Sequence, residues 1–133
     1  MDVYKYMMLA RNESLKSEYP QKVGAVIIKG NRILSKGYNK LRHLKTGKRF
    51  TEWEMSVHAE RDACRKINKD KLKGCYIFVY RELANGKTSL AKPCDDCYNL
   101  LTFLGIKRIY YSTDSFPFYD EIRLWGDMIN NYK

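Results

Sequence analysis

The sequence lacks any apolar run that approaches the roughly 20 residues needed to cross a membrane, so we expect a soluble chain with no membrane partner. It also lacks internal repeats, low-complexity tracts and linkers rich in proline, glycine or serine. Its 133 residues match the size of one domain, and we therefore expect a single domain over residues 1–133. The first residues contain neither a basic leader with a long apolar stretch nor an Arg- and Ser-rich transit pattern, which favours a cytoplasmic protein.

Cysteine and histidine are scarce, with four and two residues respectively. Two of the cysteines belong to the segment Cys94-Asp95-Asp96-Cys97. In a chain without an export signal, this spacing favours metal or redox chemistry over structural disulfides. Acidic residues are also few, with 15 Asp and Glu against 25 Lys and Arg, which gives a formal net charge of +10. That charge favours anionic ligands such as nucleotides, nucleic acid or anionic membrane surfaces, or it serves solubility alone.

The apolar pattern predicts an α/β protein with a mixed sheet of about five strands and helices on both faces. A strand, a helix and a strand over residues 75–112 predict a βαβ unit with parallel strands. The last strand, over 119–124, is expected to be antiparallel, with a final helix as the alternative. The expected elements are a helix at 2–17 capped by Asp2, strands at 22–29 and 32–38 joined by Gly30-Asn31, a loop at 40–56, a helix from Ser56 to about Asn68, strands at 75–80 and 107–112, and a helix of about ten residues between Pro93 and Gly105.

Two short segments carry the residues suited to chemistry, and both open predicted helices. They are His58-Ala59-Glu60 and Pro93-Cys94-Asp95-Asp96-Cys97. A zinc ion bound by one imidazole and two thiolates keeps a fourth position for water, whose pKa falls to about 7 in the best cases. Cys94 and Cys97 share one helical face, and the helix N-terminus favours their thiolate forms. Glu60 stands beside His58 on the turn, where it suits a general base better than a fourth ligand.

Other interpretations fit some of these residues. Cys64 or Cys75 would complete a closed structural zinc site, although buried inert thiols suit both positions better. A redox pair at Cys94 and Cys97 leaves His58 and Glu60 without roles. His43 lies in a basic loop and suits a solvated residue better than a ligand. A zinc-stabilised binding module without activity is a further alternative.

The two segments together resemble the H-x-E and P-C-x-x-C signature of the cytidine and deoxycytidylate deaminase superfamily. The segments Val23-Gly24-Ala25-Val26, Gly37-Tyr38-Asn39 and Leu104 to Tyr110 are similar to further parts of these enzymes. The resemblance implies a three-layer α/β/α fold and a homo-oligomer. It also implies zinc held by His58, Cys94 and Cys97, attack of activated water on C4 of cytosine or C6 of adenine, and proton transfer by Glu60. By the same resemblance, the Ala59 amide faces the base carbonyl and Asn39 the sugar; an ordinary structural role in a helix or turn is the alternative for each.

The expected substrate is a cytosine base in a small molecule: cytidine, dCMP, CMP or a related compound. Within the superfamily, an antiparallel fifth strand resembles the enzymes that act on free nucleosides, whereas a helical crossover to a parallel strand resembles the nucleotide and nucleic-acid deaminases. A basic group after the Asn39 position is a candidate for phosphate contacts, and its members are Arg42, Lys45, Lys48 and Arg49. The alternative is a deaminase of cytosine or adenine in single-stranded DNA or RNA, favoured by the net charge and by aromatic residues interleaved with basic ones. Lys92 stands before Pro93 where deaminases of cytosine in nucleic acids usually show serine, so the base contacts of those enzymes do not carry over directly to this chain.

Overall fold

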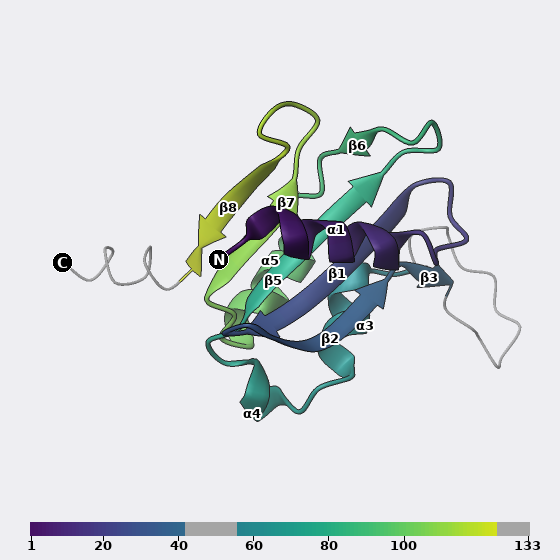
Figure 1. Ribbon diagram of the computed structural model, residues 1–133. Helices are drawn as coiled ribbons and strands as arrows, with labels where there is room; N and C mark the ends of the chain where they lie inside the picture. Colours follow the sequence, from purple (N-terminus) through teal and green to yellow (C-terminus); the bar gives the residue numbers. More distant parts are fainter. Residues whose placement is uncertain (42–55, 125–133) are drawn as a thin grey trace, which may run out of the picture.

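The structure, a computed structural model, describes residues 1–41 and 56–124 (Figure 1). No helix in these two segments has the length and apolar character that crossing a bilayer requires. The elements in chain order are α1 (Val3–Ser14), β1 (Lys22–Lys29), β2 (Arg32–Tyr38), β3 (Lys40–Leu41), β4 (Ser56–Val57), α3 (Ala59–Arg65), α4 (Lys69–Leu72), β5 (Tyr76–Glu82), β6 (Thr88–Ser89), α5 (Asp95–Phe103), β7 (Arg108–Ser112) and β8 (Tyr119–Arg123).

The main sheet is mixed and has the strand order β2-β1-β5-β7-β8, with the short β6 paired to β5. Strands β5 and β7 are parallel and are joined through α5, which confirms the predicted βαβ unit. Strand β8 pairs with β7 in the antiparallel direction, so the first prediction for residues 119–124 is confirmed and the helical alternative for 119–123 is wrong. The sixth strand, β6, arises because the chain after β5 turns back and pairs at Arg81 and Glu82.

Helices cover both faces of the sheet, as predicted, and form three layers with it (Figure 1). Alternate residues of a strand point to opposite faces, and β1 divides its apolar side chains in this way. Ala25 and Ile27 pack with α3 and α5, whereas Val26 and Ile28 pack with α1. The two cores are therefore separated by the sheet, and the segments His58-Ala59-Glu60 and Cys94 to Cys97 belong to the α3 and α5 side.

Two glycines on neighbouring strands allow the helices to approach the sheet closely. A Cβ atom at Gly24 on β1 would lie 2.0 Å from the Ala10 carbonyl oxygen in α1. A Cβ atom at Gly37 on β2 would lie 2.4 Å from the Ala63 backbone nitrogen in α3. Real Cβ atoms do not approach backbone this closely, so only glycine fits at either position. Each face of the sheet thus depends on one glycine for the distance to its helix.

The predicted helix from Ser56 to about Asn68 is wrong at both ends. Ser56 and Val57 form β4, which pairs with β3, so part of the predicted loop at 40–56 is strand and its residues 42–55 lie outside the described chain. The helix begins only after His58, whose extended backbone (φ −68°, ψ 151°) sets the first turn, and it ends at Arg65. Asn68 instead caps α4 by accepting a hydrogen bond from the Asp70 amide. The helix at 2–17 likewise ends early, at Ser14, while Asp2 caps it as predicted.

Candidate metal centre and active site

The site forms where α3 and α5 begin on the same side of the sheet. His58 and Cys94 are the N-cap residues of these helices, with extended backbones (ψ 151° and 166°). Neither side chain caps its own helix, and Cys97 lies in the first turn of α5. The starts of the two helices therefore bring one imidazole and two thiols toward a common point.

The three predicted ligand residues lie within metal-binding distance of one another. The His58 Nδ1 atom is 3.3 Å from the Cys97 Sγ atom and 3.7 Å from the Cys94 Sγ atom. All three ligand atoms lie within 4.8 Å of one another. Ordinary zinc–nitrogen and zinc–sulfur bonds in a tetrahedron place nitrogen and sulfur about 3.6 Å apart. The spacing of His58, Cys94 and Cys97 is therefore compatible with zinc.

Glu60 contributes a buried carboxyl group beside these ligands. Its residue is 5% exposed, and burial raises the pKa of its carboxyl group, with hydrogen bonds and the neighbouring His58 opposing that rise. Burial also raises the pKa of the Cys97 thiol, and the nearby Glu60 charge raises it further. Two thiolates and a carboxylate placed this close together are costly without a cation. The donor set thus fits a divalent metal on electrostatic grounds as well as by distance.

The other two cysteines lie apart from this cluster. Among the described residues, the group that could hold a metal consists of His58, Cys94 and Cys97 only. Burial, with the nearby Glu60 charge, raises the pKa of the Cys64 thiol to about 12. The Cys75 thiol is buried and donates a hydrogen bond to the Lys71 carbonyl at 3.1 Å. Both fit the interpretation as inert core thiols, whereas His43 lies outside the described residues.

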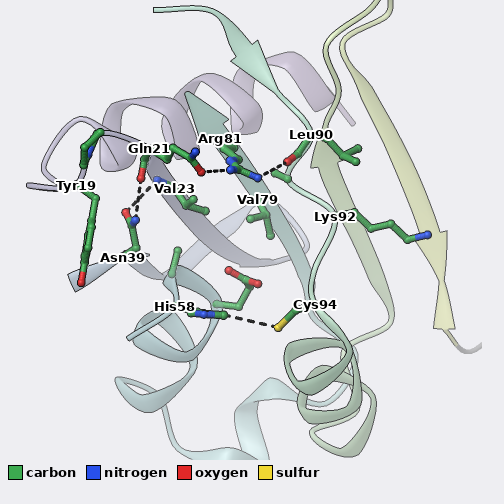
Figure 2. A pocket seen from close by; sticks show the side chains of 14 residues that line it. Tyr19, Gln21, Val23, Asn39, His58, Val79, Arg81, Leu90, Lys92 and Cys94 are labelled. Atoms are coloured by element: carbon green, nitrogen blue, oxygen red, sulfur yellow. Dashed lines mark hydrogen bonds between the residues drawn. The ribbon is translucent and has the colours of Figure 1, made fainter. Parts of the chain in front are cut away.

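A cavity of about 480 Å³ opens over the cluster (Figure 2). Its volume lies within the range of pockets for small ligands, roughly 300–1,000 Å³. Glu60, which was predicted to be catalytic, lines this cavity together with Asn39 and Ala59, which were predicted to bind the substrate. The residues that line it are Tyr19, Pro20, Gln21, Val23, Asn39, His58, Ala59, Glu60, Val79, Arg81, Leu90, Ala91, Lys92 and Cys94.

Asn39 and Ala59 both line the cavity, but one has a hydrogen-bonded side chain and the other is a buried helix residue. The Asn39 side chain accepts a hydrogen bond from the Val23 amide at 3.0 Å and donates one to the Gln21 carbonyl at 2.9 Å. It therefore holds the start of β1 at the rim of the cavity, a structural role of the kind that was the alternative at this position. Ala59 is fully buried as the first residue of α3, where a backbone N–H group has no acceptor within the helix.

The structure adds Arg81 to the site, and sequence reasoning missed its role. Arg81 follows Val79 by two residues on β5, and both line the cavity. Alternation along a strand places such residues on one face, so this signal was present in the sequence. Lys92 also lines the cavity from the segment before α5. The basic group that the sequence proposed for phosphate, from Arg42 to Arg49, lies outside the described residues.

Asp62 fixes helix α3 to the neighbouring strands. Its side chain is fully buried and forms ion pairs with Lys40 at 3.1 Å, Arg65 at 2.7 Å and Lys66 at 3.3 Å. It also accepts a hydrogen bond from the Tyr38 amide at 3.2 Å. Burial alone would raise the pKa of Asp62, but these partners hold it below its ordinary value. The helix that carries Glu60 is thus tied to both β2 and β3.

Comparison with known proteins agrees with this geometry. A sequence model of the cytidine and deoxycytidylate deaminase zinc-binding region matches residues 2–113. The tRNA-specific adenosine deaminase of Aquifex aeolicus is 32% identical over 101 residues, which cover 73% of this chain and 54% of that protein. More generally, the chain spans between about half and two-thirds of the length of the curated relatives it matches most strongly.

Solved structures show the same fold. The apo crystal structure of dCMP deaminase from the cyanophage S-TIM5 has a TM-score of 0.62 and 25% identity, and the match covers 86% of this chain and 84% of that one. Cytidine deaminase from Burkholderia pseudomallei has a TM-score of 0.68 with 18% identity and 96% coverage of both chains, which shows the fold alone. The sequence match contains both metal-ligand segments and most of the described chain. The chain therefore belongs to the cytidine and deoxycytidylate deaminase zinc-binding family.

Proposed function

We propose that this chain is a zinc-dependent hydrolase that converts a cytosine base in a nucleoside or nucleotide to uracil and releases ammonia. The observation that carries the proposal is the position of Glu60. Its buried carboxyl group lines the same cavity of ligand size as His58 and Cys94, two of the three residues of the metal-ligand cluster. A structural zinc site does not require an ionisable carboxyl group beside the metal within an open cavity, whereas hydrolysis does.

The residues of the site divide the work between metal binding and proton transfer. His58, Cys94 and Cys97 would hold zinc, which when bound acts as a Lewis acid and lowers the pKa of water toward neutrality. Glu60 would accept a proton from the attacking water, pass it to ring atom N3 and then assist the departing amine. Burial raises the pKa of its carboxyl group, which suits a residue that must hold a proton briefly near neutral pH.

The positions of Ala59 and Asn39 support their predicted roles toward the substrate. The Ala59 amide, at the first turn of α3, would donate a hydrogen bond to the base carbonyl. Asn39 is held in place by two backbone hydrogen bonds, so its side chain is preorganised at the rim where a sugar would lie. A fixed amide orients a ligand at lower entropic cost than a mobile one.

Three observations favour a small substrate. The cavity has the volume of a small-molecule pocket. Strand β8 is antiparallel, the arrangement that resembles enzymes of free nucleosides. The cyanophage dCMP deaminase was also solved in complex with dCMP and dUMP, at a TM-score of 0.60 and 25% identity to this chain.

A second candidate is a deaminase of cytosine or adenine in single-stranded nucleic acid. The Aquifex relative, at 32% identity, is named a tRNA-specific adenosine deaminase. The net charge of +10 also favours a polyanionic partner. Binding of this kind weakens steeply with salt, so salt-insensitive turnover would count against it.

Turnover assays on the zinc-loaded protein test the proposal. Cytidine, deoxycytidine, CMP and dCMP would be incubated with the enzyme, with adenosine and a cytosine- or adenine-containing RNA as comparison substrates. We expect ammonia release and a uracil product from at least one of the four small cytosine compounds. Glu60→Gln should abolish turnover with the zinc content unchanged. Turnover of RNA alone would favour the second candidate, and no turnover of any of these substrates would overturn the first candidate and the RNA form of the second.

A further inference from the structure

A group of exposed basic residues lies at the end of the main sheet that is away from the cavity. The cavity is lined by residues from the start of β1 and the end of β5, among them Val23 and Arg81. The opposite end contains the turn between β1 and β2, helix α4 and the start of β5 (Figure 1). Val23 and Lys29 mark the two ends of β1 and are separated by about 20 Å of extended strand. We call five exposed residues there the basic end: Lys29, Arg32, Lys69, Lys71 and Lys73.

Contacts around Cys75 bring the two segments of the basic end together. Lys29 and Arg32 are direct partners in the pairing of β1 with β2. The Cys75 thiol donates a hydrogen bond to the Lys71 carbonyl at 3.1 Å, and the positive charge of Lys29 opposes the rise that burial gives the pKa of this thiol. Lys73 lies two residues before Cys75 in the chain. The basic side chains of α4 and of the β1–β2 turn therefore reach solvent from one region of the surface.

The charges of the basic end are not neutralised by ion pairs. Asp70 is the acidic residue in this group, and four positive charges remain in excess. None of the ion pairs within residues 1–41 and 56–124 includes a residue of the basic end. Like charges directly opposite each other on paired strands repel, and Lys29 stands opposite Arg32. A bound polyanion would relieve this repulsion.

Phe103 adds an aromatic surface beside the basic end. It is the last residue of α5, and its side chain is 81% exposed. Two residues later, the Gly105 carbonyl accepts a hydrogen bond from the Gly74 amide at 2.8 Å, and a Cβ atom on Gly105 would lie 3.3 Å from the Lys73 Cα atom. Proteins that bind single-stranded nucleic acid combine basic side chains along the backbone with aromatic rings that stack on bases. Both components are present at this end of the sheet.

The composition of α4 favours nucleic acid over an anionic membrane. Basic helices that bind bilayers combine their charges with an apolar face that enters the headgroup region. The apolar residue of α4, Leu72, is instead buried and packs in the core on the α3 and α5 side. The exposed residues of α4 are Lys69, Asp70 and Lys71, so this helix offers a bilayer no apolar face.

We propose that the basic end and Phe103 form a docking surface for single-stranded nucleic acid, with the basic side chains on the phosphates and the ring stacked on a base. The surface is distinct from the cavity, because about 20 Å of β1 separates the two. This inference goes beyond the proposed deaminase function and does not depend on which compound the cavity accepts. It also gives part of the net charge of +10 a specific location.

Fluorescence anisotropy of the zinc-loaded full chain with a labelled oligouridine of about 20 nucleotides tests the surface. With four phosphates contacted, the logarithm of the association constant should fall with the logarithm of salt concentration at a slope of about −3, which weakens binding roughly 50-fold between 50 and 200 mM. The basic-end variant Lys71→Gln/Lys73→Gln should bind roughly 25-fold more weakly at 100 mM salt, with a slope reduced by about 1.4. Its zinc content and turnover should not change, because neither lysine lines the cavity. No binding of oligouridine at 50 mM salt would overturn the proposal.

Two variants with the same loss of charge serve as controls. Lys5→Gln/Lys87→Gln removes exposed lysines outside both the basic end and the cavity, and Arg81→Gln/Lys92→Gln removes basic residues that line the cavity. Each should leave the affinity within about 3-fold, since salt screens charges that lie far from the bound strand. A loss in Lys5→Gln/Lys87→Gln equal to that in the basic-end variant would assign binding to net charge. A larger loss in Arg81→Gln/Lys92→Gln would place the polymer at the cavity. Either result would overturn the proposal.

Phe103→Ala tests stacking separately from charge. The exposed ring can be removed without loss of core packing, and binding should weaken roughly 5- to 150-fold with an unchanged salt slope. Unchanged affinity in Phe103→Ala would overturn the assignment to single strands. Should the basic-end variant fail to fold by circular dichroism, Lys71→Arg/Lys73→Arg keeps both charges and should retain the affinity, and a loss there would contradict phosphate contacts. Binding to phosphatidylserine vesicles without binding to oligouridine would assign the surface to membranes and overturn the proposal.

Discussion

The two faces of the sheet are built alike but serve different ends. Each is approached by a helix over a glycine, Gly24 under α1 and Gly37 under α3. The α1 face is rich in aromatic residues, with the Phe78 and Tyr110 rings stacked at a centroid distance of 4.8 Å. The α3 face is packed mainly with small and aliphatic residues and carries the metal ligands. Stability can therefore be changed on one face with little effect on the chemistry of the other.

Substitution of a metal ligand should have the largest effect of the changes considered on the two faces. Cys97→Ala should lose bound zinc and at least about 1,000-fold in turnover, because a three-residue site has no spare ligand. Zinc content by mass spectrometry and ammonia release would measure the two effects. Cys64→Ala on α3 is the matched control, a buried cysteine on the same face that lies outside the cluster. Zinc loss in that control would mean that Cys64 serves as a ligand.

The paired glycines give the most direct test of the comparison. Gly24→Ala and Gly37→Ala each introduce a methyl group against helix backbone and should cost about 3 kcal/mol of unfolding free energy. Only Gly37→Ala displaces the helix that bears Glu60, and a shift of about 1 Å can cost 100-fold in rate. Urea unfolding and kcat of the folded fraction separate the two effects. A similar loss of kcat in both variants would show that the faces are coupled.

Asp62 on α3 should contribute to the free energy of unfolding in a way that depends on pH. Asp62→Asn should cost about 2 kcal/mol at pH 7, since it leaves three cations around a buried neutral group. The folded-state pKa of Asp62 is below its ordinary value of 3.8, so its stabilisation is present above that pH and is lost as the pH falls through the lowered value. The gap between variant and unsubstituted protein should therefore shrink below about pH 4. Urea titrations at pH 7 and 3 measure it, with exposed Asp70→Asn as the control. A gap that is independent of pH would contradict the assignment.

The smallest effect is expected on the opposite face. Asp2→Ala removes the side chain that caps α1 through the Lys5 amide and should cost about 1 kcal/mol. Because α1 contributes no residue to the metal cluster, zinc content and kcat should not change. Thermal unfolding monitored by circular dichroism would record the loss. A change in zinc content would show that α1 supports the other face.

The sequence allowed the metal ligands and the βαβ unit to be predicted because both depend on short-range patterns. Cys94 and Cys97 are three residues apart on one helix, and His58 stands at the start of another. The antiparallel direction of β8 was predictable because the short connection after Ser112 favours a return beside β7. The single domain over residues 1–133 and the homo-oligomer remain predictions.

Features that depend on distant contacts were missed or misplaced. Strand β4 needed the pairing of Ser56 and Val57 with β3, which a helical pattern around those residues concealed. The role of Asn39 toward a sugar stays a prediction, whereas its hydrogen bonds to Gln21 and Val23 depend on contacts between separate segments that the sequence alone does not place. Arg81 could be placed on a face by alternation, but its neighbours Gln21 and Leu90 come from segments on either side of the strand in the chain.

Ser112 holds the chain between β5 and α5 in place at several points, and so determines which part of that segment can differ in length. Its hydroxyl accepts a hydrogen bond from the Arg81 amide and donates one to the Ser89 carbonyl, while its own carbonyl accepts from the Ala91 amide at 2.9 Å. Ser112 thereby binds the segment between β5 and α5 at both of its ends, at Arg81 where it leaves β5 and at Ser89 and Ala91 where it returns toward Pro93. The tip of that segment, around Asn85 and Gly86, lies beyond these bonds. A change in the length of this tip would leave these hydrogen bonds intact, and the two metal-binding thiols that follow would stay in place.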